Sequence, residues 1–108
     1  MSNKILQINF KFHVPREQYE AAVEPLAEPI AAVPGVLWKV WLMNEADQES
    51  GGIYLFEDGA SLDAYLNSEI VAGIVSHPAL SDFSVKQFEV MAEVSEVTRA
   101  PVATAVAV

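Results

Sequence analysis

Two apolar runs joined by a polar loop constrain the fold of this chain more than any other stretch of its sequence. The first run, Val36 to Met43, follows the turn residues Pro34-Gly35 and contains both tryptophans. The loop Asn44 to Ser50 and a Gly-Gly pair then lead into the second run, Ile53 to Phe56. Two β-prone runs separated by a polar loop and glycines predict an antiparallel hairpin.

The first run is apolar on both faces of the strand it predicts. Lys39 is its one charged residue. In a regular strand the remaining side chains divide into Trp38, Val40 and Leu42 on one side and Leu37, Trp41 and Met43 on the other. A strand of this kind is normally covered on both faces. A short chain can cover one face with its own helices, so we expect something else to cover the second.

The segments before the hairpin predict one strand and one helix. Lys4 to His13 alternates between apolar and polar residues, as a strand does. A helix is expected from Pro15, with an apolar stripe at helical spacing. Pro25 and Pro29 should kink or break this helix, which we expect to end before Pro34-Gly35. The opposite, solvated face of the helix is predicted to carry Glu17, Glu20, Glu24 and Glu28.

The segments after the hairpin predict a second helix and a last strand. Asp58 and Ser61 are candidate N-caps of that helix, which should end at His77-Pro78. Phe83 to Glu93 is the expected last strand. The order β-α-β-β-α-β predicts a ferredoxin-like α+β fold, with a four-stranded antiparallel sheet and two helices on one face. We assign residues 1–94 to this domain and 95–108 to a C-terminal tail that is flexible or packed on a partner subunit.

The two faces of the predicted sheet differ in character. We expect the helices to cover the face that carries Phe10, Trp38, Tyr54 and Phe88. The opposite face is then too apolar for water and too polar for a dry core, which favours a two-fold symmetric homodimer formed sheet against sheet. Its side chains are expected to be Gln7, Asn9, Lys11, Leu37, Lys39, Trp41, Ile53, Leu55, Val85 and Gln87.

Composition limits the classes of partner. The chain has 6 basic and 15 acidic residues, a formal net charge of −9, and no basic cluster. Nucleic acid and anionic membranes are therefore poor partners. The sequence has no cysteine, no apolar run of membrane-spanning length and no signal-peptide pattern at its N-terminus. A cytoplasmic protein without disulfides is the expectation.

The common catalytic motifs are absent from the sequence. Phosphate-binding glycine loops, the G-x-S-x-G elbow and the H-E-x-x-H zinc motif do not occur. Two histidines, His13 and His77, are too few for a convincing zinc site without help from carboxylates. We therefore expect no metal, flavin or nicotinamide cofactor.

Aromatic side chains are the main candidates for a site. Most of them are expected to be core, but a pocket between the sheet and the helices would also use them. We predict that substrate is bound by Trp38, Trp41, Phe10, Tyr65 and Phe88.

Three residues are candidates for catalysis. Tyr54 has a hydroxyl that needs a partner. His77 is the better general base, because imidazole exchanges protons near neutral pH, although an ordinary loop histidine before proline is the simpler interpretation. Asn9 could donate a hydrogen bond to a bound oxygen or lie at the dimer interface.

In PGVLWKVW (Pro34 to Trp41) and GGIYLF (Gly51 to Phe56) the sequence resembles the YdhR-type putative monooxygenase family. The second helix and the tail match less well. The resemblance covers about residues 4–94 and extends to LQINFKF (Leu6 to Phe12), PLAEPIAAVPG (Pro25 to Gly35) and KQFEV (Lys86 to Val90).

The resemblance implies a dimeric α+β barrel, similar to the cofactor-free antibiotic-biosynthesis monooxygenases. It implies a cofactor-independent monooxygenase that acts on a small, electron-rich aromatic molecule in an apolar pocket. One alternative is a non-catalytic protein that binds a small molecule in the same cavity. The fold also hosts isomerases and haem-degrading enzymes, and a haem would need an axial ligand such as His77.

Overall fold

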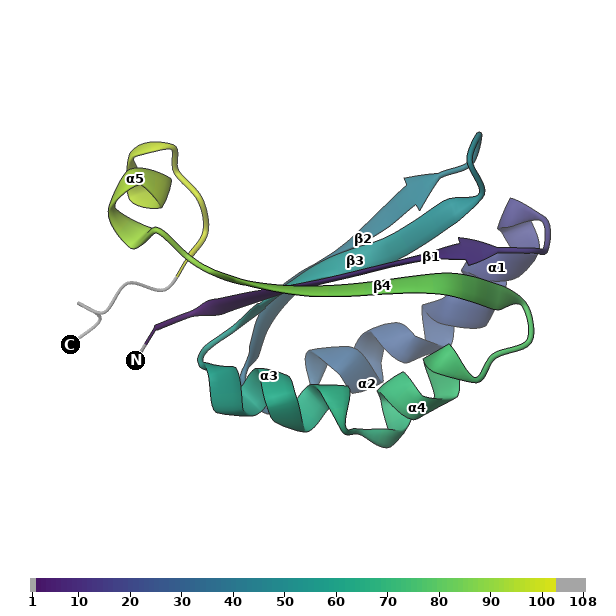
Figure 1. Cartoon of the computed structure of the whole chain (residues 1–108), viewed down its shortest axis with the longest axis horizontal. Coiled ribbons are helices and arrows are strands. Elements are labelled where there is room, and N and C mark those ends of the chain that lie inside the picture. The colour runs from purple at the N-terminus through teal and green to yellow at the C-terminus, as the bar shows by residue number, and fades with distance from the viewer. Residues whose placement is uncertain (1, 103–108) are drawn as a thin grey trace.

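The computed structural model describes residues 2–102 as one antiparallel sheet with helices packed on one of its faces (Figure 1). The spatial strand order is β2-β3-β1-β4, and all neighbours are antiparallel. This is the ferredoxin-like α+β fold that the sequence predicts. The strands are β1 (Lys4–Phe12), β2 (Val36–Asn44), β3 (Glu49–Phe56) and β4 (Leu80–Glu89).

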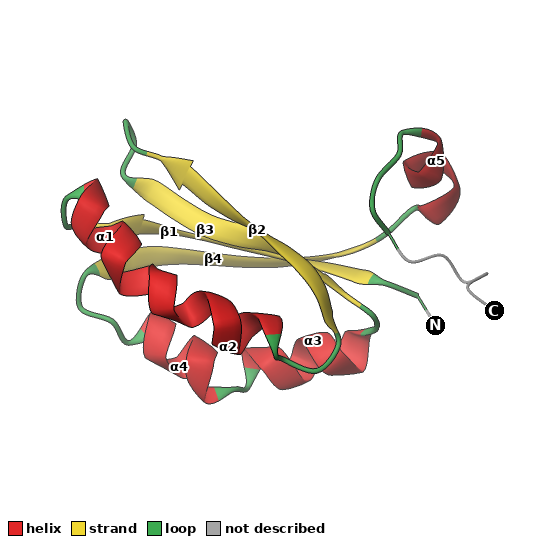
Figure 2. Ribbon diagram, turned by 180° about the vertical axis from the view of Figure 1, so that it is seen from behind, coloured by secondary structure: helices red, strands yellow, loops and turns green. Residues whose placement is uncertain are grey.

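The first helical segment is broken where its prolines predict a break. It consists of α1 (Arg16–Val23), a 3₁₀ turn (Glu24–Leu26) and α2 (Ala27–Ala31). Pro25 lies in the 3₁₀ turn, and Pro29 lies in the first turn of α2, where a missing N–H costs little. The segment follows the sheet as two offset helices (Figure 2).

The second helical segment is also two helices, and the prediction of one continuous helix was wrong. α3 (Gly59–Leu66) is capped by Asp58, whose side chain accepts the Ser61 N–H at 2.8 Å. α4 (Glu69–Val75) is capped by Ser68. The side chain of Ser68 accepts the backbone N–H of Val71, as an N-cap residue does at the start of a helix. A new helix therefore begins at Glu69, after a short break that follows Leu66.

The glycine pair lies inside β3 and not in the hairpin loop. β2 ends at Asn44 and β3 begins at Glu49, so the loop is shorter than predicted. Gly51 has φ of +149°, and a Cβ on it would collide with the carbonyl oxygen of Ile8 in β1. Glycine therefore permits the close approach of β1 and β3 at this point.

A β-bulge reverses the predicted faces of β2. Val36 pairs with Phe56, but Trp38 pairs with Leu55 and Lys39 with Tyr54, so β2 contains one extra residue. Beyond the bulge, Lys39 and Trp41 share the helix-covered face with Tyr54. Trp38 lies on the opposite face, which we call the open face. The predicted faces of Trp38, Lys39 and Trp41 were wrong because strict alternation ignores a bulge.

The last strand is shifted toward the N-terminus of the chain relative to its prediction. It ends at Glu89, and a short helix, α5 (Ala92–Val97), replaces its expected end. Phe88 pairs with Ile5, so it lies on the open face and is 47% exposed. The same pairing places Val85 opposite Ile8 and Gln87 opposite Leu6, on the helix-covered face. The predicted faces of Phe88, Val85 and Gln87 were therefore wrong.

α5 lies on the other side of the sheet from α1 to α4 (Figures 1 and 2). Beyond it, the indole N–H of Trp38 donates to the carbonyl of Pro101 at 2.7 Å. The part of the predicted tail at 103–108 lies outside the described residues.

The predicted core alternation of β1 is confirmed. Its buried residues meet the helices and β3 in a core that includes Leu6, Ile8, Phe10, Phe12, Tyr54, Phe56, Leu62 and Tyr65.

Candidate functional site

A cavity of about 420 Å³ lies between the helix-covered face of the sheet and the helices. Its volume is in the range of small-molecule sites in proteins, and its lining is mostly apolar. β1 contributes Ile8 and Phe10, and the helices contribute residues such as Tyr19, Ile70 and Ile74. The polar side chains in the lining are Gln18, Lys39, Glu69, His77 and the tyrosines Tyr19 and Tyr54.

Lys39 places an amine inside this aromatic lining. Its Nζ lies 3.4 Å from the ring centroid of Trp41 and 4.5 Å from that of Tyr54. Burial lowers the pKa of Lys39 to about 7. Within residues 2–102, the ion pairs are those of Arg16 with Glu20 and Glu45, so no carboxylate pairs with this amine. Ring faces attract an ammonium but do not neutralise it.

Tyr54 is buried behind Lys39, and its hydroxyl has the partner that the sequence requires. The hydroxyls of Tyr54 and Tyr65 lie 2.7 Å apart. Burial first, and then the neighbouring Tyr65, raise the pKa of Tyr54 far above its usual value. Tyr54 therefore stays protonated at all ordinary pH values. It can orient a ligand with its ring but cannot act as a base.

Tyr19 is a second buried tyrosine in the lining. Its hydroxyl is hydrogen-bonded to Ser50 at 2.7 Å, and burial raises its pKa. Its ring stacks on Phe12 with centroids 4.9 Å apart and meets the edge of Phe10. Tyr19 thus belongs to the rigid wall of the cavity.

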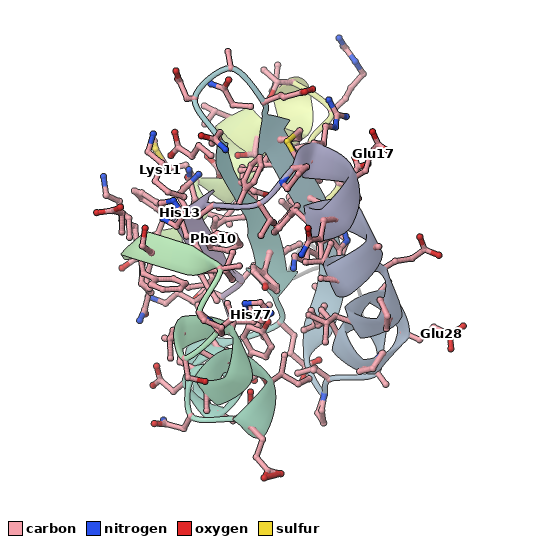
Figure 3. All side chains as sticks on the ribbon, turned by 90° about the vertical axis from the view of Figure 1, so that its right-hand side faces the viewer. Phe10, Lys11, His13, Glu17, Glu28 and His77 are labelled. Atoms are coloured by element: carbon pink, nitrogen blue, oxygen red, sulfur yellow. The ribbon has the colours of Figure 1, made fainter. Side chains whose placement is uncertain are left out.

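His77 lines the cavity from an exposed position after α4. In Figure 3, it lies between the end of that helix and the sheet, while Glu17 and Glu28 point away from the molecule, as predicted for the solvated face. The Nδ1 of His77 accepts the backbone N–H of Ala79 at 3.1 Å. In a neutral ring the hydrogen is then on Nε2. Nε2 can therefore donate a hydrogen bond to a ligand, while Nδ1 is already occupied as an acceptor.

The structure brings some of the predicted site residues together and separates others. His77, Tyr54, Trp41 and Phe10 line the cavity, and Tyr65 lies behind Tyr54. Three residues lie away from it on the open face. These are Phe88, Asn9 and Trp38. The side-chain oxygen of Asn9 accepts a hydrogen bond from Gln7 at 2.9 Å. Trp38 borders a smaller hollow near α2.

Sequence reasoning missed Lys39 and Tyr19 as lining residues. Lys39 was assigned to the opposite face, because the bulge at the start of β2 leaves no clear signal in the sequence. The glycine at position 52 was one available signal. The side chain of Lys39 lies over Gly52, and a Cβ on this residue would collide with the Lys39 Cε. A glycine within a strand often marks a close approach of this kind.

Residues 2–102 contain no group of three or more His, Cys, Asp or Glu side chains arranged to hold a metal ion. Over the same residues, no helix is long and apolar enough to cross a membrane.

The four-stranded sheet, the helices on one of its faces and the mostly apolar cavity between them define a small ferredoxin-like α+β domain. The chain belongs to the family described as "Putative mono-oxygenase ydhR", whose model matches residues 5–101. The family expected from the hairpin motifs is thereby confirmed. No curated protein matches the sequence significantly.

Several solved structures share the fold at low sequence identity. Protein SO0527 from Shewanella oneidensis has a TM-score of 0.70 at 13% identity, covering 82% of this chain and 91% of that one. SnoaB, a cofactor-independent oxygenase from Streptomyces nogalater, has a TM-score of 0.67 at 18% identity, covering 82% and 92%. The haem degrader MhuD from Mycobacterium tuberculosis has a TM-score of 0.62 at 19% identity, covering 81% and 95%.

Proposed function

We propose that this protein is a cofactor-independent monooxygenase that oxidises a small, electron-rich aromatic molecule in the cavity between sheet and helices. The observation that carries the proposal is an apolar, aromatic cavity of about 420 Å³ in a member of the ydhR family. The fold of the oxygenase SnoaB supports it. A cavity of this size accommodates a molecule of about two or three fused rings.

The chemistry requires a substrate that supplies its own electrons. In an anthrone-type compound, a CH₂ group loses a proton and the carbanion reduces dioxygen. One oxygen atom stays on that carbon as a carbonyl, and the other leaves as water with the two hydrogens. The protein would have to hold the ring, accept a proton and exclude water.

The cavity residues have distinct roles in this proposal. Trp41 and Phe10 hold the flat ring, and Tyr54 orients it while its own hydroxyl stays protonated. His77 would stabilise a developing negative charge as a donor at the cavity mouth. Asn9 and Trp38 take no direct part, because both lie on the open face.

The test compares the two tryptophans of β2. Purified protein is incubated in air with anthrone- and quinol-type compounds while dissolved oxygen is followed. Trp41→Ala should lower oxygen uptake about tenfold or more, since it removes a wall of the cavity. Trp38→Ala is the matched control and should retain most of the rate. No uptake above the buffer rate by the wild-type protein would contradict the proposal.

A non-catalytic binding protein is the second candidate, favoured by the same cavity. Its signature is a rise in melting temperature with polycyclic phenols and no oxygen consumption. Haem is included in the same panel because His77 at the cavity mouth could act as an axial ligand. A Soret band that is lost in His77→Ala would favour haem chemistry over the oxidation of phenols.

We further propose that the functional unit is a homodimer formed through the open face. This face carries Val40, 50% exposed, and Phe88, 47% exposed, next to the Gln7–Asn9 pair. A second copy would bury these apolar side chains and offer partners to the polar ones. A mass in solution that stays monomeric at every concentration would contradict this.

A further inference from the structure

Lys39 is the one lysine or arginine among the residues that line the cavity. The bulge at the start of β2 directs it to the helix-covered face, and the absence of a side chain at Gly52 leaves room for its stem. Its Nζ then lies against the rings of Trp41 and Tyr54. Backbone geometry and two aromatic rings together hold this amine at the cavity wall.

The groups that face Lys39 across the cavity do not neutralise it. Tyr54 on β3 is protonated and hydrogen-bonded to Tyr65. Tyr19 on α1 is protonated and hydrogen-bonded to Ser50. Glu69 on α4 and His77 after it are exposed lining residues, and neither forms an ion pair with the amine among the described residues. An oxyanion on a ligand would complete the site, because Lys39 is half-buried and even partial burial of a cation without a counter-ion costs free energy.

We propose that Lys39 accepts the proton of an acidic hydroxyl on the ligand and then holds the resulting oxyanion, so that the cavity selects flat phenols and enols. The O–H bond of the ligand breaks, an N–H bond forms on Nζ, and the two charges remain paired. This inference rests on the proposed function and deepens it by naming the substrate class and the group that ionises it.

The state of the free amine suits this role. With its pKa near 7, a substantial share of Lys39 is unprotonated at neutral pH and can accept a proton. The oxyanion then stabilises the ammonium, and the ring faces of Trp41 and Tyr54 add to that attraction. An ionised phenol or enol is also the form that gives electrons to dioxygen most readily.

The experiment uses a dye that reports its own ionisation. Alizarin, a dihydroxyanthraquinone, is already a quinone, and its absorption moves to longer wavelength when a hydroxyl ionises. It is titrated against the full-length protein at a series of pH values. Bound to the wild type, it should ionise at a pH about one unit or more below that of the free dye, a tenfold preference for the oxyanion.

Two substitutions isolate the amine. Lys39→Met keeps an unbranched stem over Gly52 and removes the charge, so the shift should be lost. Lys86→Met removes an exposed lysine of β4 and should keep the full shift. Urea denaturation of each variant verifies that it is folded. An equal shift in Lys39→Met and wild type, or no binding of the dye to the wild type, would overturn the inference.

Oxygen uptake separates this inference from the proposed function. If the wild type consumes oxygen and Lys39→Met does so at the same rate and with the same pH profile, the role of Lys39 is refuted while the oxygenase stands. If the wild type ionises the dye but consumes no oxygen with any phenol or enol, the oxygenase is refuted and the oxyanion site stands.

Discussion

At the scale of single residues, folding disfavours the charge on Lys39. The pKa is about 7 in the folded protein and 10.5 in an ordinary lysine. Between these two values the unfolded chain binds a proton that the folded chain does not. Stability therefore rises with pH through this window, and the full cost is present below pH 7. A group that destabilises its own fold is often kept for function.

This cost predicts how Lys39→Met affects stability. The variant should melt higher than the wild type by about 5 °C at pH 6, where the wild-type amine is charged. The difference should shrink steadily toward pH 10.5. Melting temperatures measured by circular dichroism across this range test the prediction. A variant less stable than the wild type at pH 6 would mean that the amine contributes more through its ring contacts than burial costs.

The hydroxyl pair behind the cavity gives a second prediction at this scale. Tyr65→Phe leaves the buried hydroxyl of Tyr54 without its partner and should destabilise the fold by about 1–2 kcal/mol. The double variant Tyr54→Phe, Tyr65→Phe removes both polar groups and should recover part of that loss. Urea denaturation measures both. If the double variant loses as much stability as the single variants Tyr54→Phe and Tyr65→Phe added together, the hydroxyls do not interact.

At the scale of elements, the two adjacent glycines of β3 have different tasks. A side chain at Gly51 would meet the backbone of β1, whereas a side chain at Gly52 would meet the flexible stem of Lys39. Gly51→Ala should therefore destabilise by about 2–4 kcal/mol. Gly52→Ala should cost about 1 kcal/mol or less but displace the amine and abolish the alizarin shift. Equal losses of stability in the two variants would show that Lys39 cannot move aside.

Helix α3 depends on the carboxylate at its N-cap. The backbone N–H and the side chain of Ser61 hold the pKa of Asp58 below its usual value. The ionised carboxylate of Asp58 therefore stabilises the folded protein at pH values above the pKa of Asp58 in the unfolded chain. This stabilisation is lost as the pH falls through the lower pKa of Asp58 in the folded protein. Asp58→Ala should lower the melting temperature by about 5 °C at pH 7 and by less near pH 3. Asp63→Ala, on the exposed side of the same helix, is the control.

At the scale of the whole molecule, the proposed dimer depends on the open face. Val40 and Val75 are both 50% exposed, but Val40 lies on the open face and Val75 on α4. Val40→Lys should convert the proposed dimer to a monomer, because it buries a charge at the interface. Val75→Lys should leave the dimer intact. Sedimentation equilibrium distinguishes these results, and a dimer that persists in Val40→Lys would place the interface elsewhere.

Several elements could be predicted from the sequence because the signals that specify them act over short distances along the chain. The alternation of β1, the prolines that break the first helix and the turn at Pro34-Gly35 each act within a few residues. The family was readable from the hairpin motifs. Ser68 was a readable cap as well, but the helical spacing that continues past it concealed the break between α3 and α4.

The sequence by itself determined the order of elements, the apolar face of β1 and the family, since these depend on spacing and on side-chain type. Tertiary structure alone decided which face of β2 meets the helices. One extra residue in that strand is set by its pairing with β3, and it exchanges Trp38 for Lys39 and Trp41 at the cavity. A difference of one residue in register moves every later side chain to the other face, and no local pattern records it.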